Sequence, residues 1–572
     1  MTIPDRKWWQ SATVYQIYPA SFKDSNGDGV GDLQGIISEL DYIQSIGVDV
    51  IWICPMYDSP QVDMGYDISD YEKVYPPYGT VADMEELIQK CHERGLRVLL
   101  DLVVNHTSDQ HAWFQESRSS KDNPKRDWYI WRPARYVNGE RKPPNNWLGN
   151  FMGSVWEWDE HTQEYYLHLF CPEQPDLNWE NPETRQAIYK SAMEFWLERG
   201  VDGFRVDTVN MYSKGEMLDA PVTDPRSEWQ FAGLQYCNGP RMHEFLSEMN
   251  QVLEKYDAMT VGECPHTPDM SRVLKYVSAK EKQLNMVFQF DVVDIGQGPY
   301  KFQTTPKNYT LPQLKHAIHT TQSLHRGTDA WTTVFLENHD QSRSITRFTS
   351  DAPEHRVAGG KLLSLMMTAL SGTMFIYQGQ EIGMVNFPLE WGMEEYKDVD
   401  STNYYKMVAE RTHNDPVELE AAHKSLQHLA RDHARVPLSW DSTPNAGFSA
   451  SKPWMRSLPD TAACNARAQQ KDPSSVLGFW KRMLALRRQY ADLLIYGDFD
   501  VLEKEDPEVF YFTKTYGTKK ALAVLNFTDR ELALRIPEEV RDQKAELLVS
   551  SVDGRAGDEG LVAWEGRVYL LS

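Results

Sequence analysis

Eight short apolar runs recur along the chain, and stretches with helical periodicity separate them. The runs are rich in Val, Ile, Leu and Met, which is typical of strands buried on both faces of a parallel sheet. An open doubly wound sheet seldom needs eight such strand–helix pairs, so the pattern favours an α/β fold of the (β/α)8 barrel type. The expected strands are 14–22, 50–54, 96–104, 203–207, 258–262, 286–290, 332–336 and 374–377.

Three stretches interrupt this alternation. Residues 107–177 are too long for a strand–helix connection and are dense in Trp, Tyr, Pro and Asn, which predicts an inserted subdomain after strand 3 that leans over the barrel. A second polar insertion is expected from residue 383 to about residue 473. From 499 to 572 the pattern changes to short alternating runs, which predicts a C-terminal antiparallel β-domain. The barrel is accordingly assigned to 1–106 and 178–498.

Composition excludes several classes of partner. The formal net charge of −24 argues against nucleic acid or an acidic membrane as the partner. The sequence has no apolar run long enough for a membrane span and no apolar segment of the secretory type near its start, so we expect a cytoplasmic protein. No dinucleotide fingerprint or P-loop opens a helix, so no organic cofactor is expected. The oligomeric state is not readable from the pattern.

Polar side chains follow four of the apolar runs, in the motifs DLVVNH, GFRVD, TVGE and ENHD. In a β/α barrel the carboxyl ends of all strands meet at one rim, so these side chains should lie close together. Three carboxylates, two histidines and an arginine at one rim are the groups that glycosidic bond cleavage requires. The residues concerned are His106, Arg205, Asp207, Glu263, His339 and Asp340.

A loop after the first strand carries oxygen-bearing side chains at alternating positions. Its order resembles the first nine positions of an EF-hand loop, although the twelfth position is Gly35 and a strand precedes the loop. The pattern predicts one bound Ca²⁺, with Mg²⁺ as the alternative ion, that clips the loop. The competing interpretation is a Gly/Asp-rich turn that holds only water. The expected ligands are Asp24, Asn26, Asp28, the carbonyl of Val30 and Asp32.

Longer motifs identify a family resemblance. The segments WWQSATVYQIYPASFKDSNGDGVGDLQGI (8–36), QPDLNW (174–179), FLENHDQSR (335–343) and YQGQEIGM (377–384) occur in this order. The chain resembles the α-amylase clan of glycoside hydrolases, particularly its maltase and oligo-1,6-glucosidase branch, over almost its whole length. That resemblance implies a stabilising, non-catalytic cation in the 24–32 loop.

The resemblance also implies roles for the residues at the rim. Asp207 matches the catalytic nucleophile, Glu263 the general acid/base, and Asp340 the third carboxylate, which binds sugar hydroxyls. Arg205 lies two residues before Asp207 on one strand, so it should keep that carboxylate ionised. The alternative for Arg205 is a buried pair that only ties two strands together.

Other matched residues would hold the terminal glucose. His106 and His339 resemble the histidines that bind its hydroxyls, and Tyr66 and Asp67 resemble an aromatic platform and a hydroxyl clamp. Arg435 is expected to pair with Asp67, which would close the pocket around the non-reducing end and make the enzyme exo-acting.

Thr208 follows the expected nucleophile and resembles a linkage selector of the branch, in which Thr accompanies α-1,4 preference and Val accompanies α-1,6. The resemblance therefore implies an exo-acting, retaining α-glucosidase of maltase type that acts on small oligosaccharides, with sucrose as a companion substrate. The alternatives are an oligo-1,6-glucosidase, or a transglucosylase or sucrose isomerase of the same fold. A non-enzymatic transporter heavy chain is disfavoured because the expected carboxylates are present and no membrane helix is.

Overall fold

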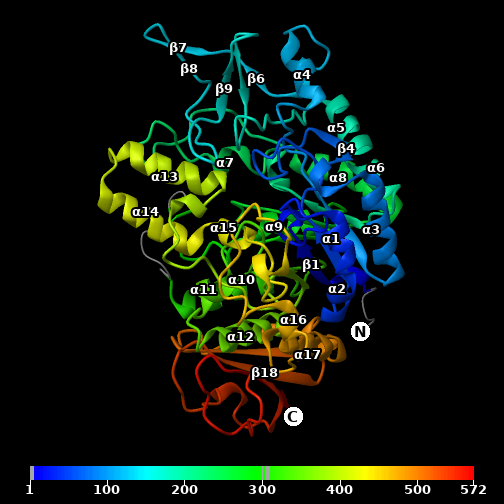
Figure 1. Cartoon of the computed structure of the whole chain (residues 1–572), viewed down its shortest axis with the longest axis vertical. Coiled ribbons are helices and arrows are strands. Elements are labelled where there is room, and N and C mark those ends of the chain that lie inside the picture. The colour runs from blue at the N-terminus through cyan, green and yellow to red at the C-terminus, as the bar shows by residue number, and fades with distance from the viewer. Residues whose placement is uncertain (1–5, 299–300, 303–308) are drawn as a thin grey trace.

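A barrel of eight parallel strands forms the centre of the computed structural model, which describes residues 6–298, 301–302 and 309–572 (Figure 1). The hydrogen-bonded order is β13-β12-β11-β5-β2-β1-β15-β14. Thr333 Oγ1 on β14 donates to the carbonyl of Val287 on β13 at 3.1 Å, which joins the two ends of this order. The predicted barrel is thus confirmed. Its strands are β1 (Thr13–Ile17), β2 (Val50–Ile53), β5 (Arg97–Leu102), β11 (Gly203–Val206), β12 (Met259–Glu263), β13 (Met286–Phe288), β14 (Thr333–Val334) and β15 (Thr373–Tyr377).

Helices pack around the outside of the barrel, and their starts follow local capping chemistry. Thr80 and Thr310 each accept a hydrogen bond from the third residue of the helix that follows and complete a capping box. The outer helices are α1 (Leu33–Ser38), α2 (Leu40–Ile46), α3 (Val81–Glu93), α5 (Pro182–Ile188), α6 (Phe195–Leu197), α8 (Met242–Leu253), α9 (Met270–Val277), α10 (Leu311–Ser323), α11 (Ser344–Phe348), α12 (Arg356–Ala369), α17 (Val476–Gln489) and α18 (Ala491–Leu494).

The first strand is shorter than expected. It was expected over 14–22 but ends at Ile17, because Pro19 has no amide hydrogen for a ladder and begins a short 3₁₀ turn instead. Two helical stretches are irregular: Glu39 divides α1 from α2, and a π-helical stretch at Tyr189–Glu194 lies between α5 and α6.

Two insertions cover the rim of the barrel, as Figure 1 shows. The first follows β5 and carries a three-stranded antiparallel sheet in the order β6-β10-β9. The second follows β15 and is largely helical. The elements of the insertions and of the other rim loops are β3 (Tyr57–Asp58), β4 (Asp70–Val74), α4 (Ala112–Ser119), β6 (Trp131–Arg132), β7 (Arg135–Val137), β8 (Glu140–Lys142), β9 (Trp156–Asp159), β10 (Glu164–Leu167), α7 (Gly233–Tyr236), α13 (Val399–Arg411), α14 (Pro416–Leu429), α15 (Asp432–Arg435) and α16 (Ala466–Gln469).

A five-stranded antiparallel sheet closes the opposite end of the molecule, in the order β16-β17-β18-β20-β19 (Figure 1). The C-terminal β-domain expected from the alternating runs is present. Its strands are β16 (Asp498–Leu502), β17 (Val509–Tyr516), β18 (Lys519–Asn526), β19 (Ala545–Ser550) and β20 (Gly566–Leu571).

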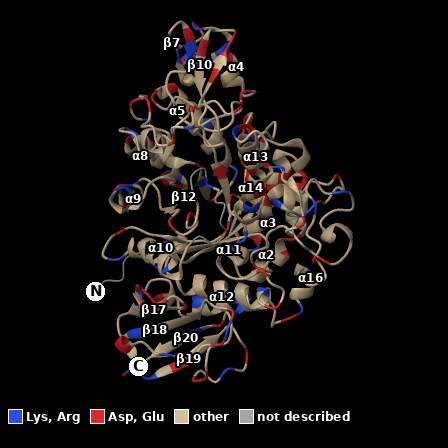
Figure 2. Ribbon diagram, turned by 90° about the vertical axis from the view of Figure 1, so that its left-hand side faces the viewer, with Lys and Arg blue, Asp and Glu red and all other residues tan. Residues whose placement is uncertain are grey.

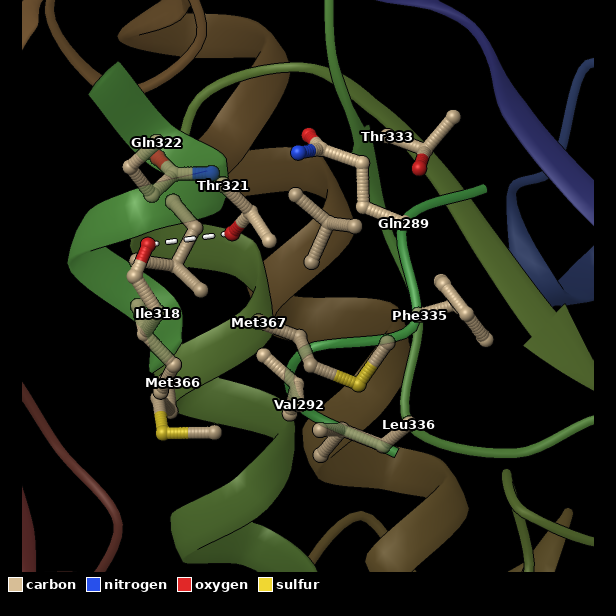
Figure 3. A pocket seen from close by; sticks show the side chains of 12 residues that line it. Gln289, Val292, Ile318, Thr321, Gln322, Thr333, Phe335, Leu336, Met366 and Met367 are labelled. Atoms are coloured by element: carbon tan, nitrogen blue, oxygen red, sulfur yellow. Dashed lines mark hydrogen bonds between the residues drawn. The ribbon is translucent and has the colours of Figure 1, made fainter. Parts of the chain in front are cut away.

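The core between α10, α12 and the barrel contains a small cavity of about 20 Å³ (Figure 3). Its lining is apolar apart from Gln289, Thr321, Gln322 and Thr333, and no ionisable side chain contributes to it. The space accommodates about one water molecule. This cavity is therefore a packing gap and not a reaction site.

Charged residues of both signs are interspersed along the ribbon (Figure 2). All six cysteines are buried and free. Within the described ranges, none of the helices combines the length and the apolarity that crossing a membrane requires.

Candidate active site

Asp207 and Glu263 stand at the carboxyl ends of two neighbouring strands. Strands β11 and β12 pair in parallel, and the ladder aligns Val206 with Gly262, one residue before each carboxylate. Thr208 donates its backbone N–H to Glu263 Oε2 at 3.3 Å. Both carboxylates are buried and both line the same cavity. The two acidic side chains singled out at strand ends thus share one site at the rim.

Arg205 joins three carboxylates through one buried guanidinium. Its Nη1 donates to Asp207 Oδ1 at 2.6 Å and to Asp101 Oδ1 at 2.7 Å. Its Nη2 lies 2.8 Å from Glu263 Oε2. The two expectations for Arg205 therefore coexist, because the same side chain ties β5, β11 and β12 together and neutralises charge beside Asp207.

Burial is the largest influence on the two facing carboxyls. It raises the pKa of Glu263 to about 7, with a smaller upward contribution from the charges of Asp207 and Asp340, while Arg205 opposes the rise. Burial also raises the pKa of Asp207 to about 6, again against Arg205. Near neutral pH this order leaves Asp207 the more ionised and Glu263 the more protonated group. Desolvation thus contributes more to the raised pKa of Glu263 than the neighbouring carboxylates do.

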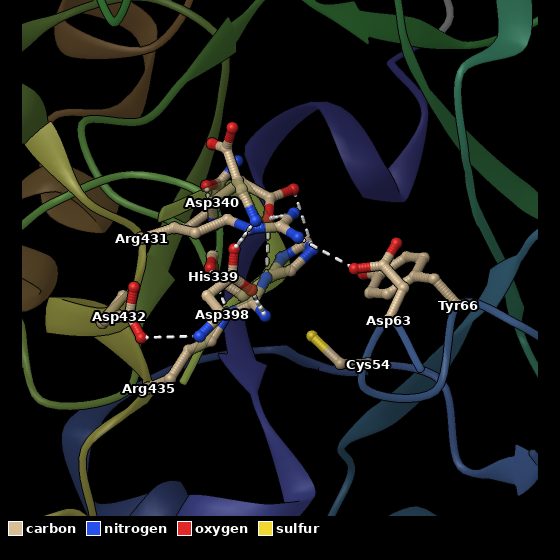
Figure 4. A network of polar contacts seen from close by, with 12 residues as sticks. Cys54, Asp63, Tyr66, His339, Asp340, Asp398, Arg431, Asp432 and Arg435 are labelled. Atoms are coloured by element: carbon tan, nitrogen blue, oxygen red, sulfur yellow. Dashed lines mark hydrogen bonds and ion pairs between the residues drawn. The ribbon is translucent and has the colours of Figure 1, made fainter. Parts of the chain in front are cut away.

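Asp340 lies in a dense polar network that Figure 4 displays. Its Oδ1 accepts from Arg431 Nη1 and from Arg435 Nη2, both at 2.9 Å. His339 Nε2 approaches its Oδ2 at 3.1 Å. Burial opposes ionisation here, but His339 and the two arginines hold the pKa of Asp340 well below its usual range. Asp398 completes the network by accepting from Arg431 Nε at 2.6 Å and Arg435 Nη1 at 2.5 Å.

The expected ion pair between Asp67 and Arg435 is wrong. Asp67 accepts hydrogen bonds from two backbone amides of its own turn and from the hydroxyl of Ser59, so its carboxylate is used within that turn. The pair across the pocket is formed four residues earlier in each motif, where Arg431 Nη2 donates to Asp63 Oδ1 at 2.8 Å. Arg435 lies behind this pair, on Asp340. Asp63 and Arg431 line the cavity, and Asp67 and Arg435 do not.

Tyr66 and His339 form a stacked pair at the base of the site. Their rings are 5.1 Å apart and nearly parallel, with an interplanar angle of 5°. Gln16 Nε2 lies 2.9 Å from His339 Nδ1 and can only donate to it. The imidazole proton is thereby placed on Nε2, which faces Asp340. Gln16 lies inside β1 with no polar motif around it, so sequence reasoning did not find it.

His106 is held by Tyr66, by its neighbour Asn105 and by Gln174 of the inserted subdomain. Its Nε2 lies 3.2 Å from the carbonyl of Tyr66 and 3.2 Å from Gln174 Nε2. Asn105 Nδ2 lies 3.3 Å from its Nδ1. Burial lowers the pKa of His106 to about 4, so the imidazole is neutral at physiological pH and serves as a hydrogen-bonding group.

A cavity of about 160 Å³ lies between these side chains. That volume is below the roughly 300–1,000 Å³ typical of pockets for larger ligands, and it suits a single sugar ring. The cavity also exposes aromatic walls from the inserted subdomain, which the sequence argument did not identify. Its lining is Asp63, Tyr66, His106, Asn150, Phe151, Phe170, Asp207, Thr208, Met211, Glu263, Pro265, His266, Phe290, Asp340 and Arg431.

Thr208 has an unusual backbone and a direct contact with the expected nucleophile. Its φ is +39°, which is sparsely populated for a β-branched residue and costs on the order of 1–3 kcal/mol. Its Oγ1 donates to Asp207 Oδ2 at 3.2 Å. The side chain expected to select the linkage thus also contacts the Asp207 carboxylate.

The loop expected to bind a cation is folded around its own amides. Asp24, Asn26, Asp28 and Asp32 each accept at least one backbone N–H of the loop or of the following helix. Across the described ranges, no group of three or more His, Cys, Asp and Glu side chains is placed to hold a metal. The proposed ligand set also uses an amide oxygen and the carbonyl of Val30. Such an all-oxygen set suits Ca²⁺ or Mg²⁺.

Comparisons with known proteins find similar chains over almost the whole length. Residues 16–497 match the family described as alpha amylase, catalytic domain. An α-glucosidase of Candida albicans is 51% identical over 99% of this chain and 100% of its own length. An oligo-1,6-glucosidase of Saccharomyces cerevisiae is 48% identical over 99% of this chain and 98% of its own. Among solved structures, a sucrose complex of a variant of MutB, the trehalulose synthase of Pseudomonas mesoacidophila, covers 100% of both chains with a TM-score of 0.93 at 36% identity.

Proposed function

The chain belongs to the alpha-amylase family of glycoside hydrolases, and from this premise we propose that it is an exo-acting, retaining α-glucosidase which releases terminal α-1,4-linked glucose from maltose and short oligosaccharides. One observation carries the proposal. The carboxyls of Asp207 and Glu263 contact the same guanidinium at the ends of adjacent strands, in a buried cavity whose volume suits one sugar ring. Retaining hydrolysis needs two such carboxyls close together, one to attack and one to deliver a proton.

In the first step, Asp207 attacks the anomeric carbon of the terminal glucose. Its Oδ1 is held by Arg205 at 2.6 Å, whereas its Oδ2 has only the longer contact with Thr208 Oγ1, so Oδ2 is the oxygen that forms the bond. As the glycosidic C–O bond breaks, Glu263 donates its proton to the departing oxygen. The products are a glucosyl ester of Asp207, a shortened sugar and the Glu263 carboxylate.

In the second step, the Glu263 carboxylate takes a proton from a water molecule that attacks the same carbon. The ester bond to Asp207 breaks, and the products are α-glucose, free Asp207 carboxylate and protonated Glu263. Asp340, kept ionised by His339 and two arginines, holds hydroxyls of the ring and stabilises the positive charge of the oxocarbenium-like transition state.

The pocket closes behind the terminal sugar because Asp63 and Arg431 bond across it. A closed end leaves room for a non-reducing terminus and excludes a chain that passes through, which supports exo action. Thr208 supports the preference for α-1,4 linkages, and sucrose is a companion substrate.

A second candidate is α-1,6 specificity, because relatives at 48% and 45% identity are named oligo-1,6-glucosidases. A third is sugar transfer or isomerisation, because a similar structure is that of a trehalulose synthase. Initial rates on maltose, isomaltose, sucrose and maltotriose, with products resolved at high sugar concentration, separate these activities.

Trapping the intermediate tests the mechanism. The Glu263→Gln enzyme lacks the base for the second step, so α-glucosyl fluoride, whose leaving group needs no acid, should accumulate a glucosyl adduct. Peptide mapping should place that adduct on Asp207, and the Asp207→Asn enzyme should not form it. Initial release of β-glucose by the unmodified enzyme, observed by NMR, would contradict retention.

A further inference from the structure

An exposed aromatic ring stands beside the catalytic cavity, outside its lining. Phe231 precedes α7 and is 48% exposed, although it is a large apolar side chain. Its ring meets the His266 ring edge-to-face, with centroids 5.0 Å apart and an interplanar angle of 76°. His266 in turn lines the cavity together with Glu263. Phe231 is thus one ring removed from the reaction site.

Gly233 leaves room for the Phe231 ring to pack against His266. A Cβ atom placed on Gly233 would lie 2.5 Å from Phe231 Cζ and 3.0 Å from His266 Cδ2, so only glycine lets the two rings meet there. His266 has a φ of +52°, a backbone conformation that non-glycine residues seldom adopt. Scattered exposed apolar residues need no explanation. Phe231 differs because part of its ring packs against His266 while the rest is exposed to solvent.

Phe231 lies on the side of the cavity where the leaving group is expected. Glu263 protonates the departing oxygen, so the first sugar beyond the scissile bond lies on the Glu263 side of the cavity. Thr208 contacts Glu263 through its backbone N–H, and His266 lines the cavity three residues after Glu263. A second sugar that leaves the cavity past His266 would meet the Phe231 ring, because the two rings are in contact.

We propose that Phe231 is a stacking platform for the second sugar on the leaving-group side, which makes the enzyme favour trisaccharides over disaccharides. This inference rests on the proposed function. A pyranose ring has an apolar face of C–H bonds with slight positive charge, and an aromatic face is negative, so the two surfaces attract and exclude water. The seated ring loses little conformational freedom when a sugar binds.

Three substrates with different leaving groups test the platform. α-Glucosyl fluoride has no leaving sugar, maltose has one and maltotriose has two. Phe231→Ala should lower kcat/KM on maltotriose about 5- to 10-fold, mainly through KM, and should change the value on maltose and on the fluoride less than about twofold. Phe231→Tyr should restore the preference for maltotriose, because a second aromatic ring can stack. Leu234→Ala is the matched control, since Leu234 is 77% exposed in the same segment.

Failure of the stacking platform and failure of the proposed function would give different results. Unchanged maltotriose kinetics in Phe231→Ala, or an equal fall on all three substrates, would overturn the platform. If Phe231→Ala does not fold, Phe231→Leu keeps an apolar side chain without a ring and answers the same question. If the unmodified enzyme does not hydrolyse α-glucosyl fluoride at all, that result would instead contradict the proposed function itself. If isomaltose proves to be the better disaccharide, isomaltotriose replaces maltotriose in the comparison.

Discussion

Replacing Asp63 with Asn should lower activity without lowering stability. Asp63 receives a 2.8 Å bond from Arg431 across the pocket, and both side chains are at most 8% exposed. Asparagine has nearly the same shape but no charge, so the bond weakens without a cavity. Hydrogen bonds to charged groups contribute about 1.5–3 kcal/mol. If the pair positions the terminal sugar, kcat/KM on maltose should fall about 10- to 150-fold.

The stability effect should have the opposite sign. Burial raises the pKa of Asp63 from 3.8 to about 7, although Arg431 opposes the rise. Because the folded state holds this proton more tightly than the unfolded state, stability is lost as pH rises through that window. At pH 7.5 the ionised carboxylate costs up to about 4 kcal/mol, at 1.36 kcal/mol per pH unit. Arg431 keeps two other carboxylate partners in the variant, so no charge is left alone.

Asp63→Asn should therefore leave Tm at pH 7.5 unchanged or higher while kcat/KM falls. The matched control is Asp67→Asn, four residues later, where the carboxylate serves only its own turn. That variant should lose roughly 1–3 kcal/mol of stability and a few degrees of Tm, with kcat/KM near normal. Maltose kinetics and thermal melts of both variants suffice. Normal catalysis in Asp63→Asn together with a large loss in Asp67→Asn would refute the assignment of the pocket-closing pair.

Further predictions follow from the same contacts. The pH profile of kcat/KM should be bell-shaped, with an acid limb near 6 from Asp207 and an alkaline limb near 7 from Glu263; a flat profile from pH 5 to 9 would contradict these roles. Thr208→Val should lower the maltose-to-isomaltose rate ratio and also lower kcat on both, because the bond to the nucleophile is lost; an unchanged ratio excludes a selector role. If the 24–32 loop binds Ca²⁺, a chelator should lower Tm and added Ca²⁺ should restore it, whereas an unchanged Tm with no metal by elemental analysis would exclude the site. Lys514 is buried and burial lowers its pKa well below the usual value, a cost that grows as pH falls, so Lys514→Met should raise Tm at pH 7; a lower Tm would show that the ammonium contributes stability.

The barrel and the positions of Asp207 and Glu263 at its rim were predictable because strand pattern and chemistry coincide. An apolar run buries a strand on both faces, and a polar residue at its carboxyl end has no place except the rim. Asp207 and Glu263 satisfy both conditions. Strand extent was less predictable, since the apolar residues after Ile17 continue past a proline that prevents the ladder.

The pocket-closing pair was misplaced because each motif offers two equivalent candidates. Asp63 and Asp67 lie four residues apart, as do Arg431 and Arg435. Residue type cannot distinguish a carboxylate that bonds its own turn from one that faces a cavity, because that choice depends on which amides the turn leaves unpaired. Asp398 was missed for a related reason, since it lies in an insertion with no strand to orient it.

The network around Asp340 implies that the two halves of the pocket are completed by different parts of the chain. Asp207 and Glu263 need only the barrel, whereas Asp340 is held ionised by arginines at 431 and 435, which belong to the insertion after β15. Asp340 therefore gains its two arginine partners only where this insertion packs on the barrel. The barrel therefore supplies the facing carboxyls of Asp207 and Glu263, and the insertion determines whether Asp340 stays ionised and whether the pocket has a closed end.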